Sequence, residues 1–256
     1  MTLDIFEGNL EKYTDPVKYD QLYNHYQEDL AFILECAQDS NQPIIELACG
    51  TGRLTIPMAK KGYTMYGIDI HNGMLNQAKY KAALEDLNIQ FMQQDCTKLN
   101  LPINSPLIFM TGNSFQHFLT NESQDDLFTS VKAHLQSKGS FIFDTRNPIL
   151  KELATVEETV ERNTINNKQI VHEKHLEVYD HNTQILNCTT TSEMIENGTL
   201  IITNKDSILL RYTFPLELER LLKSNGFELV ELYGSWKKAR FNKDSVSMVV
   251  HCRLKD

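Results

Sequence analysis

The sequence predicts an α/β protein with a doubly wound, mostly parallel sheet and an inserted antiparallel β cap. Between residues 43 and 147, short apolar runs alternate with segments of helical periodicity, as in strands joined by crossover helices. Residues 165–212 instead contain long runs rich in Thr, Asn, Glu and Lys that are separated by turn signals, which is typical of an antiparallel meander with one wet face. At 256 residues the chain can bury a substantial core.

The N-terminal segment is predicted to form one helix ahead of the sheet. Asp15-Pro16 supplies a capping side chain and a proline at the first helical position. Apolar and tyrosine side chains then recur near helical spacing from Tyr19 to Leu34. We expect this helix to lie over the mouth of a site on the sheet.

The central part is predicted to alternate between strands and helices. The expected strands are 44–49, 63–69, 89–93, 107–111 and 140–144, and the expected helices are 53–61, one that follows Asn72, and 122–137. Pro57 lies inside the first of these helices, so we expect a kink there. Lys138-Gly139 supplies a glycine signal for the end of the last helix.

The rest of the chain is predicted to hold the cap and the closing elements. Turns at Asp180-His181-Asn182 and Asn197-Gly198 separate the cap strands, and a helix opens at Pro215. Two antiparallel strands close the fold. We therefore divide the chain into a cofactor-binding half with the N-terminal helices (1–149), a cap that would bind the substrate (150–212), and a closing helix with strands (213–256).

The junction between the first strand and its helix carries the strongest functional signal. Its sequence is Glu46-Leu47-Ala48-Cys49-Gly50-Thr51-Gly52-Arg53, and glycines at such a junction let the backbone approach a ligand closely. Asp69 ends the second strand, seventeen residues after Gly52, where a carboxylate suits the paired hydroxyls of a ribose. The pattern predicts a nucleoside-bearing cofactor above a parallel sheet.

The charge pattern at this junction favours S-adenosylmethionine over NAD. A dinucleotide fingerprint needs glycines at positions 48, 50 and 53, but Ala48 and Arg53 occupy the outer two. A pyrophosphate needs backbone N–H groups and no nearby anion, whereas Glu46 suits a cationic ligand. S-adenosylmethionine carries a sulfonium and an ammonium group. A glycine turn that binds no ligand remains the alternative.

This junction resembles the glycine-rich motif of class I S-adenosylmethionine-dependent methyltransferases, with Ala48 in place of the first glycine. Later motifs of that family would fall at Asp69, Met74, Gln94-Asp95-Cys96 and Met110-Thr111, and the chain is most similar to the small-molecule branch that includes amino-sugar N-methyltransferases. The resemblance implies a Rossmann-like, seven-stranded sheet, with S-adenosyl-L-methionine as cofactor and S-adenosyl-L-homocysteine as product. The cofactor residues that it implies are Tyr19, Glu46, Ala48, Gly50, Gly52, Arg53, Asp69, Ile70, Met74, Asp95, Cys96 and Met110.

His117 is the candidate catalytic residue. It follows the fourth strand on a loop that would face the methyl group, and a near-neutral pKa would let it take a proton from an amine or a hydroxyl. An exposed loop histidine is the alternative. The candidates for substrate binding, each of which also has an ordinary core or surface explanation, are Tyr13, Arg146, Arg211, Tyr212 and Trp236.

Composition and charge limit the kinds of partner that we expect for this chain. The net charge of −9 argues against a nucleic acid, which needs a basic stripe. No apolar run is long enough to span a membrane, no signal pattern opens the chain, and the five cysteines are scattered, so we expect a cytoplasmic protein with reduced thiols. His172 and His175 would point to opposite faces of a strand, so we expect no metal site.

We therefore expect an enzyme that moves a methyl group to nitrogen or oxygen of a small metabolite by in-line displacement, acting as a monomer or homodimer. The alternatives are methylation of a protein or an RNA, and a non-catalytic protein that binds S-adenosylmethionine. Gly112-Asn113-Ser114 stands where adenine-N6 methyltransferases carry a double-proline motif. An NAD oxidoreductase is disfavoured by Glu46 and Arg53.

Overall fold

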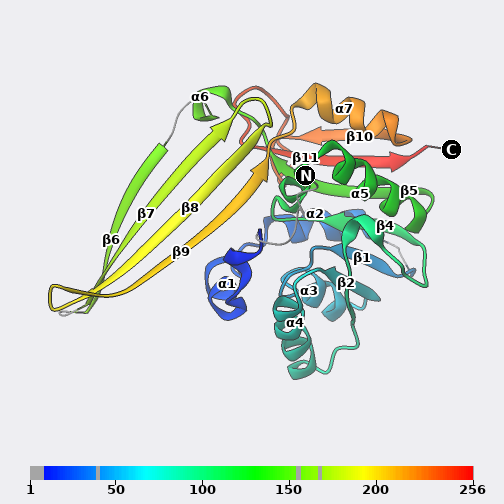
Figure 1. Ribbon diagram of the computed structural model, residues 1–256. Coiled ribbons are helices and arrows are strands. Elements are labelled where there is room, and N and C mark those ends of the chain that lie inside the picture. The colour runs from blue at the N-terminus through cyan, green and yellow to red at the C-terminus, as the bar shows by residue number, and fades with distance from the viewer. Residues whose placement is uncertain (1–8, 39–40, 154–156, 167–168, 256) are drawn as a thin grey trace.

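The computed structural model describes residues 9–38, 41–153, 157–166 and 169–255. A seven-stranded sheet forms the body of the protein (Figure 1). Its strands are β1 (Ile44–Leu47), β2 (Met65–Asp69), β3 (Gln90–Gln93), β4 (Ser105–Met110), β5 (Leu135–Arg146), β10 (Phe227–Tyr233) and β11 (Ser247–Leu254). Across the sheet they are arranged in the order β10-β11-β5-β4-β1-β2-β3.

The sheet is parallel except at β11. Strand β1 pairs in parallel with β2 and β4, and the ladder continues in parallel to β3 on one side and β5 on the other. Strand β11 is antiparallel to both β5 and β10. The strand order reverses between β1 and β4, and in such sheets a ligand crevice forms beyond the carboxyl ends of the strands at that point. The predicted doubly wound, mostly parallel fold is confirmed.

Helices cover both faces of the sheet. The α-helices of the described chain are α1 (Pro16–Tyr23), α2 (Glu28–Cys36), α3 (Thr55–Lys60), α4 (Asn72–Leu84), α5 (Asn121–His134), α6 (Leu150–Leu153) and α7 (Pro215–Ser224). One apolar core includes Phe128 of α5 and Leu222 of α7, and the other includes Phe32 of α2 and Met58 of α3. Along β5, Phe141 belongs to the first core and Ile142 to the second, as the two-residue period of a strand requires.

The N-terminal segment forms two helices, where the sequence predicted one. α1 ends at Tyr23 and α2 begins at Glu28. At the break, a side chain from the glycine-rich junction contacts the backbone: Arg53 Nη1 donates to the carbonyl oxygen of Tyr26 at 2.8 Å. That carbonyl is held by a tertiary contact, which local periodicity cannot reveal.

Two further details of the helices bear on the sequence prediction. α5 ends at His134, where the sequence predicted residue 137, because β5 already begins at Leu135. His134 is buried at this boundary, and its Nε2 lies 3.1 Å from the Leu101 N–H that donates to it. Pro57 is the third residue of α3, and it lies between Ile56 and Met58, whose N–H groups bond to the carbonyls of Gly52 and Leu54 at 3.0 Å each. Pro57 cannot make the corresponding bond to Arg53, and the kink stays a prediction.

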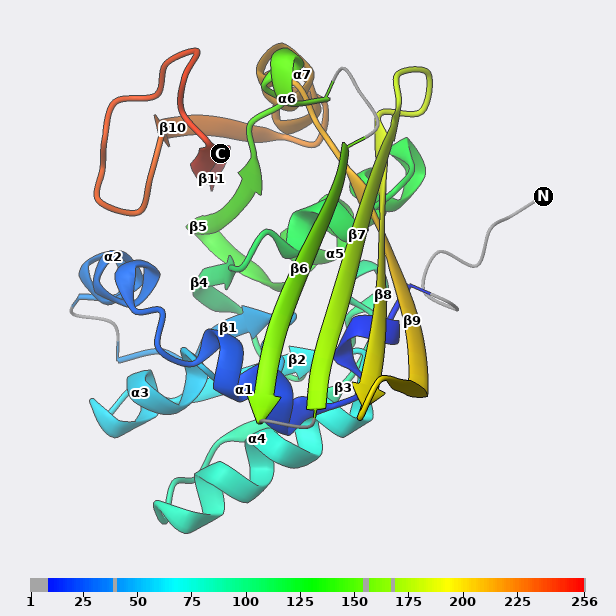
Figure 2. The same cartoon turned by 90° about the vertical axis from the view of Figure 1, so that its left-hand side faces the viewer.

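Between α6 and α7 the chain forms a second, antiparallel sheet. Its strands pair in sequence order: β6 (Glu157–Asn166), β7 (Gln169–Asp180), β8 (Ile185–Glu196) and β9 (Thr199–Arg211). Figures 1 and 2 show this cap beside the body, over the side on which α1 lies. Asn197 (φ 48°) and Gly198 (φ 82°) form the predicted hairpin turn. The sequence prediction missed β6, whose polar run Glu157–Asn166 lacks the apolar alternation of a strand.

Candidate active site

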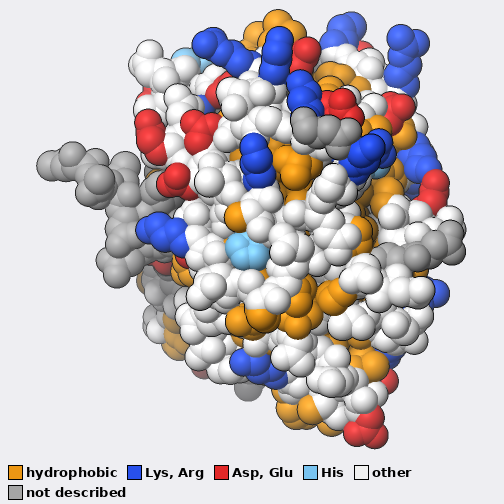
Figure 3. Space-filling view, turned by 90° about the vertical axis from the view of Figure 1, so that its right-hand side faces the viewer, with side chains coloured by type: hydrophobic (Ala, Val, Ile, Leu, Met, Phe, Trp, Pro, Cys, Tyr) orange, Lys and Arg blue, Asp and Glu red, His pale blue; other side chains and the backbone are white. Residues whose placement is uncertain are grey.

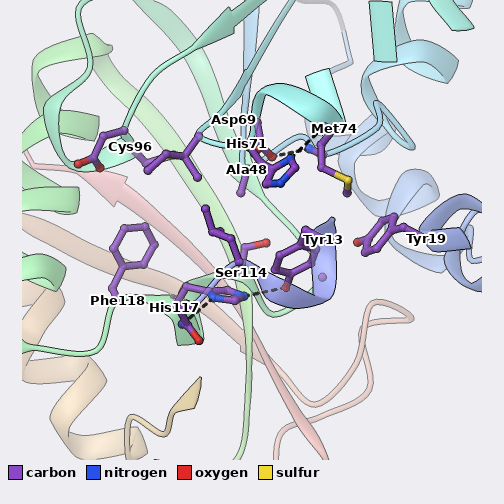
Figure 4. Close-up of a pocket in the computed structure, with 16 residues that line it drawn as sticks. Tyr13, Tyr19, Ala48, Asp69, His71, Met74, Cys96, Ser114, His117 and Phe118 are labelled. Carbon is purple, nitrogen blue, oxygen red and sulfur yellow. Dashed lines mark hydrogen bonds between the residues drawn. The ribbon is translucent and has the colours of Figure 1, made fainter. Parts of the chain in front are cut away.

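A cavity opens at the carboxyl ends of β1 to β4 (Figure 4). The sequence-predicted residues on its wall are Tyr13, Tyr19, Ala48, Gly50, Asp69, Ile70, Met74, Asp95, Cys96 and His117. The prediction missed the other lining residues, which are Asn9, Leu10, His71, Gly112, Ser114 and Phe118. Two of these carry a local signal: His71 caps α4 by accepting from Met74 N–H at 3.2 Å, and Gly112 follows β4 with a φ of 73°. Asn9 and Leu10 are brought to the cavity by tertiary folding alone.

The loop after β1 turns through three residues in the left-handed region. They are Ala48 (φ 50°), Gly50 (φ 55°) and Gly52 (φ 80°). A non-glycine residue is uncommon there, so Ala48 holds a conformation that the glycine of the family motif adopts without cost. A Cβ on Gly50 would lie 3.4 Å from Met74 Cε. The side chain missing at Gly50 therefore leaves room between the loop and α4.

Asp69 connects the loop after β1 to the residues that precede α4 through two hydrogen bonds. One carboxylate oxygen accepts from Gly50 N–H at 2.7 Å and the other from His71 N–H at 2.8 Å. The side chain is buried, and burial raises the pKa of this carboxyl above its usual value although both backbone bonds oppose the rise. Each oxygen keeps a lone pair for a ligand hydroxyl.

Asp95 and Cys96 lie on the wall after β3. One oxygen of Asp95 accepts from both Thr97 N–H and Thr97 Oγ1, each at 2.8 Å, which fixes the side chain as the cap of a short 3₁₀ helix. Cys96 is buried, and burial raises the pKa of its thiol to about 12. The thiol is therefore neutral and can contribute only packing to this wall.

Four predicted cofactor residues lie off the cavity wall, namely Glu46, Gly52, Arg53 and Met110. The Glu46 carboxylate accepts from Thr55 Oγ1, and burial raises its pKa to about 8, so at neutral pH it is largely uncharged. The argument that Glu46 offers an anion to a cationic ligand is therefore not supported. Arg53 forms a buried ion pair with Asp29 and also donates to Thr111 Oγ1 at 3.2 Å.

His117 lies on the wall with both ring nitrogens near polar partners (Figure 4). Its Nε2 is 2.9 Å from Tyr13 Oη, and its Nδ1 is 3.4 Å from Asn9 Nδ2. The expectation of a near-neutral pKa is wrong, because burial lowers the pKa of His117 to about 4. At physiological pH the ring is neutral, and a weak base with both nitrogens engaged is poorly suited to remove a proton. Tyr13 and Tyr19 also stay neutral, since burial raises the pKa of each hydroxyl.

The residues predicted to bind substrate divide into two groups. Arg146 and Tyr212 line a second cavity, of about 370 Å³, between the cap and the body, together with His175 and Glu177 of β7. Tyr13 lies in the first cavity. Arg211 and Trp236 line neither cavity.

Arg211 and Trp236 each make buried contacts that join separate elements of the fold. Arg211 is buried in an ion pair with Glu217 (2.7 Å), which ties the end of β9 to α7. Trp236 is buried against Phe32, and its Nε1 donates to Asp144 at 3.3 Å. In the described part of the chain, no group of three or more His, Cys, Asp or Glu side chains is placed to hold a metal ion.

Comparison with known proteins identifies the domain around the first cavity. The model of a family described as the methyltransferase domain matches residues 44–139. Residues 44–139 are therefore similar to a methyltransferase domain, and we call them the methyltransferase domain below. The match covers the loop after β1, Asp69, Asp95 and His117, and the cofactor of this family is S-adenosylmethionine.

An uncharacterized methyltransferase from Oceanobacillus iheyensis is 29% identical to this chain over 147 residues. That alignment covers 55% of this chain and 65% of the relative. The chain spans less than two thirds of the length of the curated relatives that it matches first.

Solved methyltransferases share the fold over nearly the whole chain. An S-adenosylmethionine-dependent methyltransferase from Clostridium acetobutylicum has a TM-score of 0.78 at 19% identity, covering 93% of this chain and 98% of that one. An amino pentose methyltransferase from Micromonospora echinaspora, bound to S-adenosylmethionine, has a TM-score of 0.69 at 12% identity, covering 99% and 98%. At these identities the likeness establishes the fold, with the cap included.

The cavity fits the cofactor of the family. The room beside Gly50, which a Cβ would partly fill, admits a ligand next to the backbone. Asp69 offers an acceptor pair for two hydroxyls, and Met74 and Ile70 offer apolar surface for an adenine. The charged side chains on the described wall are the acids Asp69 and Asp95, which suits a ligand that carries positive charge.

Proposed function

We propose that the protein transfers a methyl group from S-adenosylmethionine to nitrogen or oxygen of a small metabolite, with S-adenosylhomocysteine as product. The observation that carries the proposal is the cavity built from the loop after β1, Asp69, Met74 and Asp95 within the methyltransferase domain. When bound there, the cofactor supplies an electrophilic methyl group on a sulfonium. The acceptor atom forms the new bond as the carbon–sulfur bond breaks, and the acceptor loses a proton.

In this proposal each wall residue has one task. Asp69 binds the ribose hydroxyls, because its two oxygens are already aimed by Gly50 and His71. Met74 packs on the adenine, and Asp95 accepts from the adenine amino group. Tyr13 and Tyr19 present their rings and hydroxyls to the rest of the ligand; the two ring centroids are 5.8 Å apart.

The second cavity is our candidate for the acceptor pocket. Its position under the cap puts it beside the methyltransferase domain, and strand β9 contributes to both sites: Leu210 lines the second cavity, while the backbone of Leu209 bonds to Asn9 on the first. Arg146 and Glu177 give this cavity both signs of charge, which suits a small polar acceptor. The amino pentose methyltransferase with the same fold favours an acceptor of this class.

The surface gives less support to a nucleic-acid substrate. On the face shown in Figure 3, Lys and Arg side chains are interspersed with Asp and Glu, and they form no continuous basic stripe. The net charge of −9 acts in the same direction, because a polyanion would be repelled. In the described chain no helix is long and apolar enough to cross a membrane.

Positioning is proposed to supply most of the acceleration. Aligning an acceptor with the methyl carbon contributes roughly 7–11 kcal/mol, whereas a general base contributes about 3–5 kcal/mol. The low pKa of His117 fits this balance, since a free amine acceptor can lose its proton to water after transfer. The enclosing residues and the cap then have the main role, which is to orient the acceptor and exclude water.

Calorimetry followed by an acceptor screen tests the proposal. We expect S-adenosylmethionine and S-adenosylhomocysteine to bind the purified protein and NAD to release no heat. The protein with S-adenosylmethionine is then incubated with panels of small amines, amino sugars and hydroxylated metabolites, and mass spectrometry detects products heavier by one methylene. Absence of heat with both sulfur compounds would overturn the cofactor assignment. Binding without turnover on any panel would favour the non-catalytic alternative.

A further inference from the structure

Asn9 joins the cap to the histidine on the wall of the first cavity. Its Oδ1 accepts from Leu209 N–H at 2.6 Å, and its Nδ2 donates to the Leu209 carbonyl at 3.0 Å. The same Nδ2 lies 3.4 Å from Nδ1 of His117. Asn9 is buried, so these contacts are shielded from water. One amide side chain therefore pairs with strand β9 and reaches the imidazole ring.

The backbone of Leu209 fixes the orientation of this amide. A backbone N–H can only donate and a backbone carbonyl can only accept, so Oδ1 faces the first and Nδ2 the second. One hydrogen of Nδ2 is used by the Leu209 carbonyl. The second is directed to His117 Nδ1, which must then accept and carry no proton.

The remaining proton of the ring therefore lies on Nε2. This nitrogen is 2.9 Å from Tyr13 Oη, so His117 donates and the hydroxyl oxygen of Tyr13 accepts. The hydroxyl hydrogen of Tyr13 then needs another partner, and among the described residues none accepts it. Tyr13 lies on the cavity wall, where a ligand can provide that acceptor.

We propose that Asn9 is a positioning residue that fixes the tautomer of His117 with the proton on Nε2, and thereby makes the Tyr13 hydroxyl a hydrogen-bond donor into the cavity. The partner of this donor is an oxygen atom of the bound molecule, and a carboxylate is the best candidate. The described lining residues include no Lys or Arg, so a ligand carboxylate has to be held by neutral donors such as this hydroxyl. The identity of the ligand rests on the proposed function; the tautomer does not.

Nitrogen-15 NMR of the ligand-free protein tests the tautomer directly. Long-range correlation from the ring carbon-bound protons distinguishes a protonated nitrogen from a bare one, and His117→Gln assigns the signals. We expect Nε2 protonated and Nδ1 bare from pH 6 to 9. A wild-type spectrum with the proton on Nδ1 overturns the proposal whether or not the protein transfers methyl groups. Failure of cofactor binding, in turn, leaves this measurement unaffected.

Variants separate the role of Asn9 from simple docking of the cap. Asn9→Ala should produce a mixture of tautomers, and Asn9→Asp should move the proton to Nδ1 and raise the pKa of His117. Glu11→Ala is the matched control, because Glu11 bonds the same N-terminal segment to β9 through Ser207 N–H at 2.8 Å without touching His117. We expect its His117 spectrum to match the wild type. An unchanged tautomer in Asn9→Ala, or an equal change in Glu11→Ala, contradicts the proposal.

Tyr13→Phe tests the donor. It removes the hydroxyl and keeps the ring, so we expect about tenfold weaker binding of the ligand whose oxygen the hydroxyl meets. A higher Kd for S-adenosylhomocysteine assigns that oxygen to the cofactor, and a higher KM for the acceptor at unchanged Kd assigns it to the acceptor. If neither constant changes, the hydroxyl donates to no ligand and this part of the proposal is wrong.

Discussion

Asp69→Asn is the sharpest test of the proposed cofactor site. The substitution keeps the size of the side chain but replaces one carboxylate oxygen with an amide nitrogen. In the wild type both oxygens accept backbone N–H groups, at 2.7 Å from Gly50 and 2.8 Å from His71. An amide can accept only one of these bonds, and the nitrogen confronts the other N–H. The loop after β1 is therefore perturbed together with the lone pairs offered to the ribose.

The expected loss in affinity follows from the bonds that disappear. A hydrogen bond to a charged group contributes about 1.5–3 kcal/mol and one to a neutral group about 0.5–1.5 kcal/mol, so losing one carboxylate–hydroxyl bond and making the other neutral costs roughly 2.5–4.5 kcal/mol. Since 1.4 kcal/mol corresponds to a factor of ten, the Kd for S-adenosylhomocysteine should rise about 60- to 1,500-fold. The effect on folding should be smaller, because only one backbone N–H loses its partner.

Titration calorimetry with S-adenosylhomocysteine measures the change, and thermal unfolding shows whether the variant is folded at the temperature used. Asp126→Asn serves as the control, because Asp126 is on the exposed side of α5 and the same charge is removed away from the cavity. It should bind like the wild type. If folded Asp69→Asn binds within threefold of the wild type, Asp69 does not hold the ribose and the placement of the cofactor is wrong.

Three other changes have distinct expected outcomes. Arg53→Met should lower the free energy of unfolding, measured by urea denaturation, by about 3–5 kcal/mol, because it leaves the buried Asp29 carboxylate unpaired. The double variant Arg53→Met with Asp29→Leu should recover much of this loss. Burial raises the pKa of Glu46 from its ordinary 4.5 to about 8, so the folded state binds the extra proton and stability declines as pH rises between these values. Glu46→Gln, which can still accept from Thr55 Oγ1, should therefore show a flatter decline of Tm from pH 5 to 8; an identical slope in both proteins would contradict the assignment. Arg146→Met should raise the KM for the acceptor about tenfold with an unchanged Kd for S-adenosylhomocysteine. If only the Kd for S-adenosylhomocysteine changed, Arg146 would not belong to the acceptor pocket.

Local sequence was a good guide to the wall of the first cavity because most of that wall is local. Gly50, Asp69 and Asp95 each lie at or just beyond the end of a parallel strand, and Met74 lies in the first turn of the helix that follows Asp69. Parallel strands bring such positions to one edge of the sheet. The same reasoning placed Glu46 in the site, although its carboxyl accepts from Thr55 behind the loop. Alternation along a strand says which residues are buried, but it does not say which buried side chain meets a ligand.

Contacts between distant segments decided the rest. Arg53 bonds to Tyr26 between α1 and α2, and Leu209 of the cap orients Asn9 on His117. Burial then removes the near-neutral pKa that a loop histidine would have in water.

The sequence by itself determined the alternation of strands and helices, the glycine turn at Gly50 and the acid at Asp69, since each follows from periodicity and backbone conformation within a short stretch. Only the tertiary structure decided the charge of Glu46, the partner of Arg53 and the protonation of His117. Those properties depend on the dielectric environment and on hydrogen-bond partners that are far away along the chain, and neither is encoded in local spacing.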